Sequence, residues 1–152
     1  MWFNPIVKTL LKSPFHRVVS KTMMLITFTG RKSGHVYTLP VSYFQMVDDD
    51  GVYIASVSSK DRIWWRNLRG GKLTTVFIKG KSYQATSEVF EKNETVYKYF
   101  LSMFSSHANL AKWFAISINA DGKPDVGQTR LLAEKSVFIR TQVNGDLFNI
   151  GK

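Results

Sequence analysis

Short apolar runs, rich in β-branched and aromatic residues, alternate along this chain with turns that contain glycine and aspartate. Runs of this kind between turn residues are typical of β-strands. Strands are expected at residues 23–29, 35–46, 51–57, 73–79, 81–90 and 137–141. Several strands at short spacing, with short helices between them, favour a small barrel over a doubly wound parallel sheet.

Helical spacing of apolar residues appears in the remaining segments. Helices are expected at residues 4–13, 15–20, 93–104 and 125–134, with a looser apolar segment at 110–116. The first helix is amphipathic, because Ile6, Val7, Leu10 and Leu11 form one stripe. We expect residues 1–21 to form a helical cap on a single domain of residues 1–152. The same pattern would also suit peripheral contact with a membrane interface, so that alternative stays open.

Composition limits the chemistry that the chain can perform. The 152 residues include no cysteine, which excludes disulfides, a thiolate nucleophile and a cysteine-type zinc site. His16, His35 and His107 lie far apart and show no metal-binding spacing, so no metal site is expected. No apolar stretch is long enough to span a bilayer, and no signal peptide is visible. We therefore expect a cytoplasmic protein, with membrane association only through residues 1–21.

The net charge of +10 is concentrated in two segments. Residues 1–47 carry six basic side chains and no acidic one, and residues 60–72 carry five basic side chains and one acidic one. A field of this sign attracts polyanions, whether nucleic acid, anionic lipid or a phosphorylated cofactor.

A basic turn at residues 29–34 (Thr-Gly-Arg-Lys-Ser-Gly) separates the first two expected strands. Arg31 offers a planar fork of donors, Lys32 a compact cation and Ser33 a hydroxyl. This cluster suits a phosphate or carboxylate group. The alternative is a solvated turn whose charges only keep the chain soluble.

A second basic segment lies between Asp61, a good helix N-cap, and Gly70, a good residue after a helix end. A helix of about two turns fits between them and would place Arg62, Arg66 and Arg69 on one face. With its paired tryptophans, this segment could form the wall of a pocket for a flat, anionic ligand. Alternatively, Trp65 and Leu68 are core residues and the arginines are a solvent face.

Several motifs, in matching order and spacing, resemble the deazaflavin-dependent nitroreductase/quinone reductase family. They are residues 29–34, 38–41 (Thr-Leu-Pro-Val), 55–56 (Ala-Ser) and 64–68 (Trp-Trp-Arg-Asn-Leu). The resemblance implies an α+β, mainly β fold: a split β-barrel of the flavin-binding type with short flanking helices, related to flavin reductases and pyridoxamine-phosphate oxidases. It also implies coenzyme F-420, a deazaflavin with a strongly anionic tail.

The resemblance further implies roles for particular residues. Arg31, Lys32 and Ser33 would hold the phosphate of the tail, Ser56, Ser59 and Lys60 would lie along the cofactor, and Trp64 and Asn67 would close the pocket. Thr38, Pro40, Ala55 and Trp65 belong to the matching motifs and are also expected to bind cofactor.

The absence of an evident nucleophile, carboxylate pair or triad in the sequence agrees with hydride transfer, which requires mainly placement of the cofactor. The expected reaction is reduction of a quinone, nitro compound or similar small acceptor. Tyr37 and Tyr43, on the strand leaving the basic turn, are candidate catalytic residues that protonate the product. A homodimer is possible, since related barrels bury a flavin at a dimer interface.

Two alternatives remain. Tyr37 stands where many family members carry a basic residue, which leans toward FMN or another phosphorylated planar molecule, because a single phosphate needs fewer cations. A nucleic-acid or anionic-membrane binding module is the other alternative. The chain has no recognisable nucleic-acid-binding motif, so no nucleic-acid partner is expected.

Overall fold

The computed structural model describes residues 23–144. The helical cap expected at residues 1–21 lies outside this range. The described chain folds into two compact units. The first contains residues 23–57, 62–89 and 139–144, and the second contains residues 58–61 and 90–138. The single domain inferred from chain length stays a prediction.

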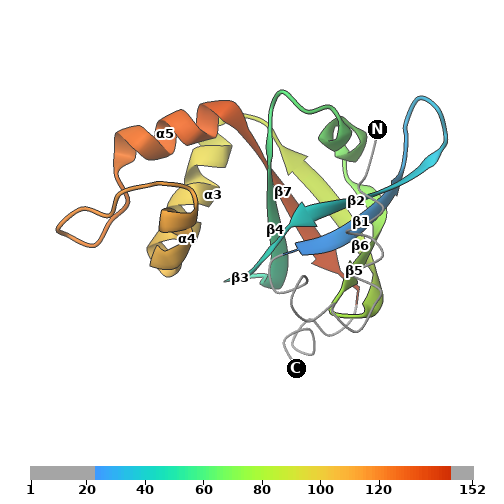
Figure 1. The fold of residues 1–152 in the computed structure, drawn as a ribbon, viewed down its shortest axis with the longest axis horizontal. Helices are drawn as coiled ribbons and strands as arrows, with labels where there is room; N and C mark the ends of the chain where they lie inside the picture. Colours follow the sequence, from blue (N-terminus) through green and yellow to red (C-terminus); the bar gives the residue numbers. More distant parts are fainter. Residues whose placement is uncertain (1–22, 145–152) are drawn as a thin grey trace. The chain divides into compact units, whose positions relative to one another are not determined.

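A seven-stranded sheet dominates the described residues (Figure 1). Its strands are β1 (Met23–Thr29), β2 (Val36–Ser42), β3 (Phe44–Asp48), β4 (Gly51–Ser59), β5 (Lys72–Ile78), β6 (Lys81–Phe90) and β7 (Ser136–Val143). In space they follow the order β2-β1-β5-β6-β7-β4-β3. β1 pairs antiparallel with β2 and β5, β3 with β4, and β5 with β6.

The order of the strands requires the sheet to curl. β2 and β3 lie at the two opposite edges, yet only Tyr43 separates them in the sequence. One residue spans only about 3.5 Å, so the two edges must approach each other. Closing a sheet in this way produces a barrel. The expected fold class is therefore confirmed: an α+β, mainly β arrangement of the split-barrel type.

Apolar side chains and a chain of hydroxyl groups fill the interior of the first unit. Ile26, Val76 and Ala85 are fully buried on adjacent strands. Beside them, the Ser87 hydroxyl lies 2.9 Å from that of Thr74 and 2.8 Å from that of Thr141. These contacts satisfy three buried polar groups across β5, β6 and β7.

The second unit is mainly helical. It contains α3 (Asn93–Ser106), α4 (Ala108–Trp113) and α5 (Val126–Lys135). Its core is aromatic: the rings of Phe100 and Phe104 stack with centroids 5.5 Å apart, and Phe138 meets Phe100 edge-on at 6.2 Å. Asp125 caps α5 by accepting a hydrogen bond from the Gln128 amide, as a residue at the start of a helix should.

Two expected elements differ in the structure. The strand expected at 35–46 is divided at Tyr43 into β2 and β3. The two-turn helix expected after Asp61 is a short 3-10 helix, η1 (Trp64–Leu68). Gly70 and Gly71 follow η1 with positive φ angles and turn the chain into β5. Within residues 23–144, no helix combines the length and apolarity needed to cross a membrane.

Candidate anion-binding site

The basic turn between β1 and β2 has a defined backbone conformation. The Gly30 amide donates to the His35 carbonyl at 2.7 Å, and the Gly34 amide donates to the Gly30 carbonyl at 2.9 Å. Gly34 has φ +72°, a value that side-chain-bearing residues rarely adopt. The turn therefore presents Arg31, Lys32 and Ser33 on a fixed framework.

Asn67 joins this turn to η1. The Arg31 amide donates to Asn67 Oδ1 at 3.0 Å, and Asn67 Nδ2 donates to the Trp64 carbonyl at 2.9 Å. Both polar ends of the side chain thus bind backbone groups. Asn67 was predicted to contact cofactor, and the structure shows it holding the two basic segments together.

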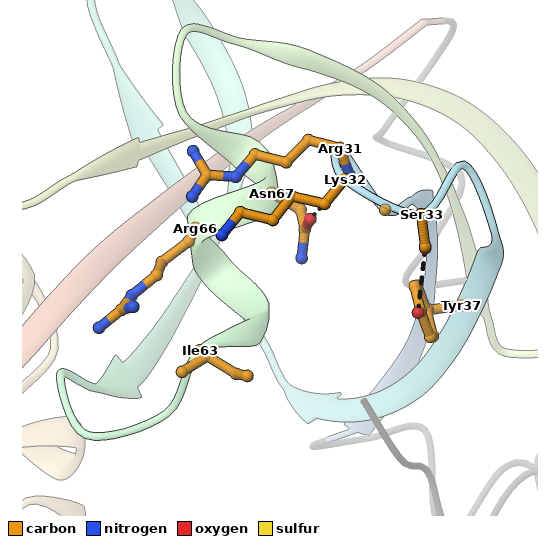
Figure 2. Close-up of a pocket in the computed structure, with 8 residues that line it drawn as sticks. Arg31, Lys32, Ser33, Tyr37, Ile63, Arg66 and Asn67 are labelled. Carbon is orange, nitrogen blue, oxygen red and sulfur yellow. Dashed lines mark hydrogen bonds between the residues drawn. The ribbon is translucent and has the colours of Figure 1, made fainter.

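A pocket of about 220 Å³ lies between the turn and η1 (Figure 2). Its lining residues come from both segments and all belong to the first unit: Gly30, Arg31, Lys32, Ser33, Tyr37, Ile63, Arg66 and Asn67. Sites that enclose a whole small molecule usually measure about 300–1,000 Å³. This pocket is therefore suited to one end of such a ligand.

Among residues 23–144, three cations line this pocket, and no acidic side chain does. In Figure 2 the side chains of Arg31 and Lys32 extend across η1, and that of Arg66 projects from η1 itself. No ion pair within residues 23–144 involves any of the three. Like charges held close together repel one another, so this arrangement favours an anionic ligand.

Two hydroxyl groups line the pocket at the side of the turn. Ser33 Oγ accepts a hydrogen bond from the His35 amide at 3.1 Å and lies 3.2 Å from the Tyr37 hydroxyl. Only one of these two hydroxyls can donate to the other. Whichever does so, the second O–H group is left to donate to a ligand.

The other residues predicted from the motifs lie in the strands. Thr38 and Pro40 lie on β2, where the Thr38 hydroxyl contacts that of Thr27 at 2.8 Å and Pro40 opposes Leu25. Ala55 and Ser56 are buried in β4. Ser56 Oγ is unusual, because it is buried without a hydrogen-bond partner in the described chain. None of these four residues lines the pocket.

The two tryptophans of η1 are buried. Trp64 and Trp65 are 6% and 4% exposed, and the ring of Trp64 lies 6.1 Å from that of Phe28. The guanidinium carbons of Arg66 and Arg69 lie 5.7 and 5.3 Å from the centroid of Trp65, within cation–π range. The burial of Trp65 agrees with the core alternative raised from the sequence.

Ser59 and Lys60 belong to the second unit. The Ser59 hydroxyl accepts a hydrogen bond from the Asp61 amide at 3.2 Å, and Lys60 Nζ donates to Asn93 Oδ1 at 2.6 Å. The Lys60 side chain therefore links the end of β4 to the start of α3. Both residues remain predicted, not observed, cofactor contacts.

The two candidate proton donors differ in environment. Tyr43, between β2 and β3, is 6% exposed, and burial raises the pKa of its hydroxyl to about 12. The hydroxyl is therefore a weak acid that stays protonated at neutral pH. Tyr37 is half-buried and lines the pocket. Their role in catalysis stays a prediction.

Three residues that line the pocket were not predicted from the sequence as site residues: Gly30, Ile63 and Arg66. Arg66 was grouped with Arg62 and Arg69 as one helical face. Because η1 begins only at Trp64, Arg62 lies before it, and of the three arginines only Arg66 lines the pocket. Its position next to Asn67 was the available signal.

Comparison with known proteins gives structural matches only. No family model matches the chain, and no curated protein matches it. An F-420-H2-dependent reductase is 18% identical over 79% of this chain and 94% of its own, with a TM-score of 0.42. A protein described as a domain-swapped dimer is 18% identical over 90% of this chain and 99% of its own, with a TM-score of 0.43. A protein of unknown function from Agrobacterium tumefaciens strain C58 is 14% identical over 90% of this chain and 60% of its own, with a TM-score of 0.45.

Proposed function

We propose that this chain is a reductase that binds a planar, phosphorylated redox cofactor by its anionic end, with coenzyme F-420 as the first candidate. One observation carries the proposal: two basic segments far apart in the sequence are joined by the Arg31–Asn67 hydrogen bond and line one pocket. The motifs that resemble the deazaflavin-dependent reductases include both segments.

The residues present fit such a cofactor. Arg31, Lys32 and Arg66 would bind the charged tail, and the free O–H group of the Ser33–Tyr37 pair would add a neutral donor. The buried, unpartnered hydroxyl of Ser56 has the character of a group that a bound ligand satisfies. We propose Ser56 as a cofactor contact, and the motifs imply the same role for Thr38, Pro40, Ala55, Ser59, Lys60 and Trp64.

Hydride transfer needs little reactive chemistry from the protein. A reduced deazaflavin supplies the hydride when bound, and the chain supplies binding, orientation and exclusion of water. Reduction of a quinone to a hydroquinone then requires one proton in addition to the hydride. We propose Tyr37 and Tyr43 as candidate donors of that proton.

FMN is the second candidate. The neutral side chain of Tyr37 in the pocket, where many family members carry a cation, favours it, since a single phosphate needs less positive charge. Both candidates share a flat ring system and an anionic end, so the same pocket would serve either.

Thermal unfolding in the presence of F-420, FMN and FAD tests the proposal. A ligand at one hundred times its dissociation constant adds about 2.7 kcal/mol of stability. For a chain of this length that corresponds to a rise in melting temperature of roughly 5–10 °C. A cofactor that stabilises the chain is then supplied in reduced form with a quinone, and its reoxidation is followed by absorbance. Absence of any shift with all three would contradict the proposal.

A further inference from the structure

The pocket holds more positive charge than one singly charged group requires. Arg31, Lys32 and Arg66 line it, and no carboxylate from the part of the chain that the structure describes does so. Arg31 and Lys32 come from one turn, whereas Arg66 comes from η1. The third cation therefore reaches the pocket through tertiary structure, from a different element than the other two.

Arg66 has a close counterpart that does not reach the pocket. Arg69 lies three residues further along, and its guanidinium also packs over the ring of Trp65. The two arginines thus share a charge, an aromatic neighbour and an exposed position. Only Arg66 lines the pocket. Arg69 contacts Trp65 without lining the pocket. Packing against Trp65 therefore does not by itself explain why Arg66 lines it.

We propose that Arg66 makes this pocket selective for a doubly charged anionic group over a singly charged one. Such a group is either a phosphomonoester dianion or a phosphodiester with an adjacent carboxylate. This inference deepens the proposed function and rests on it, because it concerns the anionic end of the proposed cofactor. It assigns to Arg66 a role in specificity that the motifs do not imply.

The charge dependence follows from Coulomb's law. Removing one cation at a fixed distance weakens the attraction in proportion to the charge of the ligand. The change in the logarithm of the affinity should therefore be twice as large for a dianion as for a monoanion. If Arg66→Gln weakens a monoanion about threefold, it should weaken a dianion about ninefold. A variant that only disturbed the fold would weaken all anions by the same factor.

Three small probes separate the possibilities without any redox cofactor. Methyl phosphate is a dianion at pH 8, dimethyl phosphate is a monoanion, and methyl phospholactate is a phosphodiester that carries a carboxylate. Their dissociation constants are measured by titration of the backbone amide signals of the turn at low salt. The unmodified protein should bind at least one of the doubly charged probes at least fivefold more tightly than dimethyl phosphate. The preferred one identifies the source of the second charge.

Variants of both arginines complete the test. Arg66→Gln should reduce the preference for double charge by about threefold, while Arg66→Lys should retain most of it. Arg69→Gln, which removes the same charge and the same contact with Trp65, should leave the preference unchanged. Equal binding of all three probes, or an equal loss of preference in Arg66→Gln and Arg69→Gln, would overturn the inference. Stabilisation by neither F-420 nor FMN would instead contradict the proposed function, so the two failures are distinguishable.

Discussion

Substitution of Gly30 by alanine should distort the pocket, because the added methyl group would displace neighbouring side chains that line it. A Cβ atom at this position would lie 2.6 Å from Cε2 of Tyr37 and 2.9 Å from Oγ of Ser33. Carbon atoms in contact normally lie about 3.5–4.0 Å apart, so the tyrosine ring must move by about 1 Å. That movement would break the 3.2 Å contact between the two hydroxyls.

The cost of this substitution can be bounded from the structure. Overpacking typically costs about 1–3 kcal/mol, and loss of a hydrogen bond about 0.5–1.5 kcal/mol. Tyr37 is only half-buried, so its ring can move toward solvent and reduce the strain. We expect a net loss of about 1–2 kcal/mol, or roughly 2–8 °C in melting temperature. Affinity for methyl phosphate should fall by about threefold to tenfold, which corresponds to about 0.7–1.4 kcal/mol.

Calorimetry and amide-signal titration measure the two effects. Gly127→Ala is the matched control, because its Cβ would meet only Asp125 Oδ1, at an ordinary 3.5 Å, inside α5. It should be neutral or slightly stabilising, since alanine favours a helix more than glycine does. Adding Tyr37→Ala to Gly30→Ala removes the clash with the tyrosine ring, the closer of the two contacts, so the double variant should cost less than the sum of the single ones. A Gly30→Ala protein with unchanged melting temperature and phosphate affinity would refute this reasoning.

Three further predictions concern the pocket, a helix end and a surface ion pair. Asn67→Ala should lower phosphate affinity and slightly lower stability, because the Arg31 amide loses its partner; unchanged signals of the turn amides would contradict this. Ala115→Gly should raise stability by about 0.5–1 kcal/mol in denaturant unfolding, because Ala115 is exposed with φ +59° and ends α4 in a left-handed conformation that glycine adopts without strain. The hydrogen bond from Arg140 lowers the pKa of Asp48 below its usual value of 3.8, so the resulting stability is present above that pH and is lost as pH falls through the lowered pKa. The melting temperatures of the unmodified protein and of Asp48→Asn should therefore differ at pH 6 and converge near pH 2, and a constant difference would contradict the assignment.

Strand identity could be predicted from the sequence more fully than strand pairing. The bounds of β1 and β6 agree with those expected, and a glycine marks one end of each: Gly30 follows β1 and Gly80 precedes β6. The apolar run at 35–46 gave no sign that the strand is interrupted at Tyr43. Apolar residues continue through this position, although the chain passes there from one edge of the sheet to the other. That break depends on contacts with β1 and β4, which local pattern does not contain.

The site was predictable in its parts but not in its geometry. The residue types in the basic turn indicated an anion, and the structure brings them to a pocket with η1. The role of Asn67 as a link was not visible, because it depends on a hydrogen bond to a backbone amide 36 residues away. The shortness of η1 was also hidden, since a 3-10 turn and an α-helix begin with the same residue types.

The position of β7 in the sheet has a consequence for folding during synthesis. β7 lies between β4 and β6 in the sheet, although 45 residues of sequence (91–135) separate it from the nearer of the two. During synthesis, the backbone edges of β4 and β6 that pair with β7 therefore stay unpaired until residues 136–143 have left the ribosome. Pairing over such separations slows folding, and open edges recruit other chains. Chains that stall before residue 136 should aggregate, whereas chains that extend past residue 143 can close the sheet.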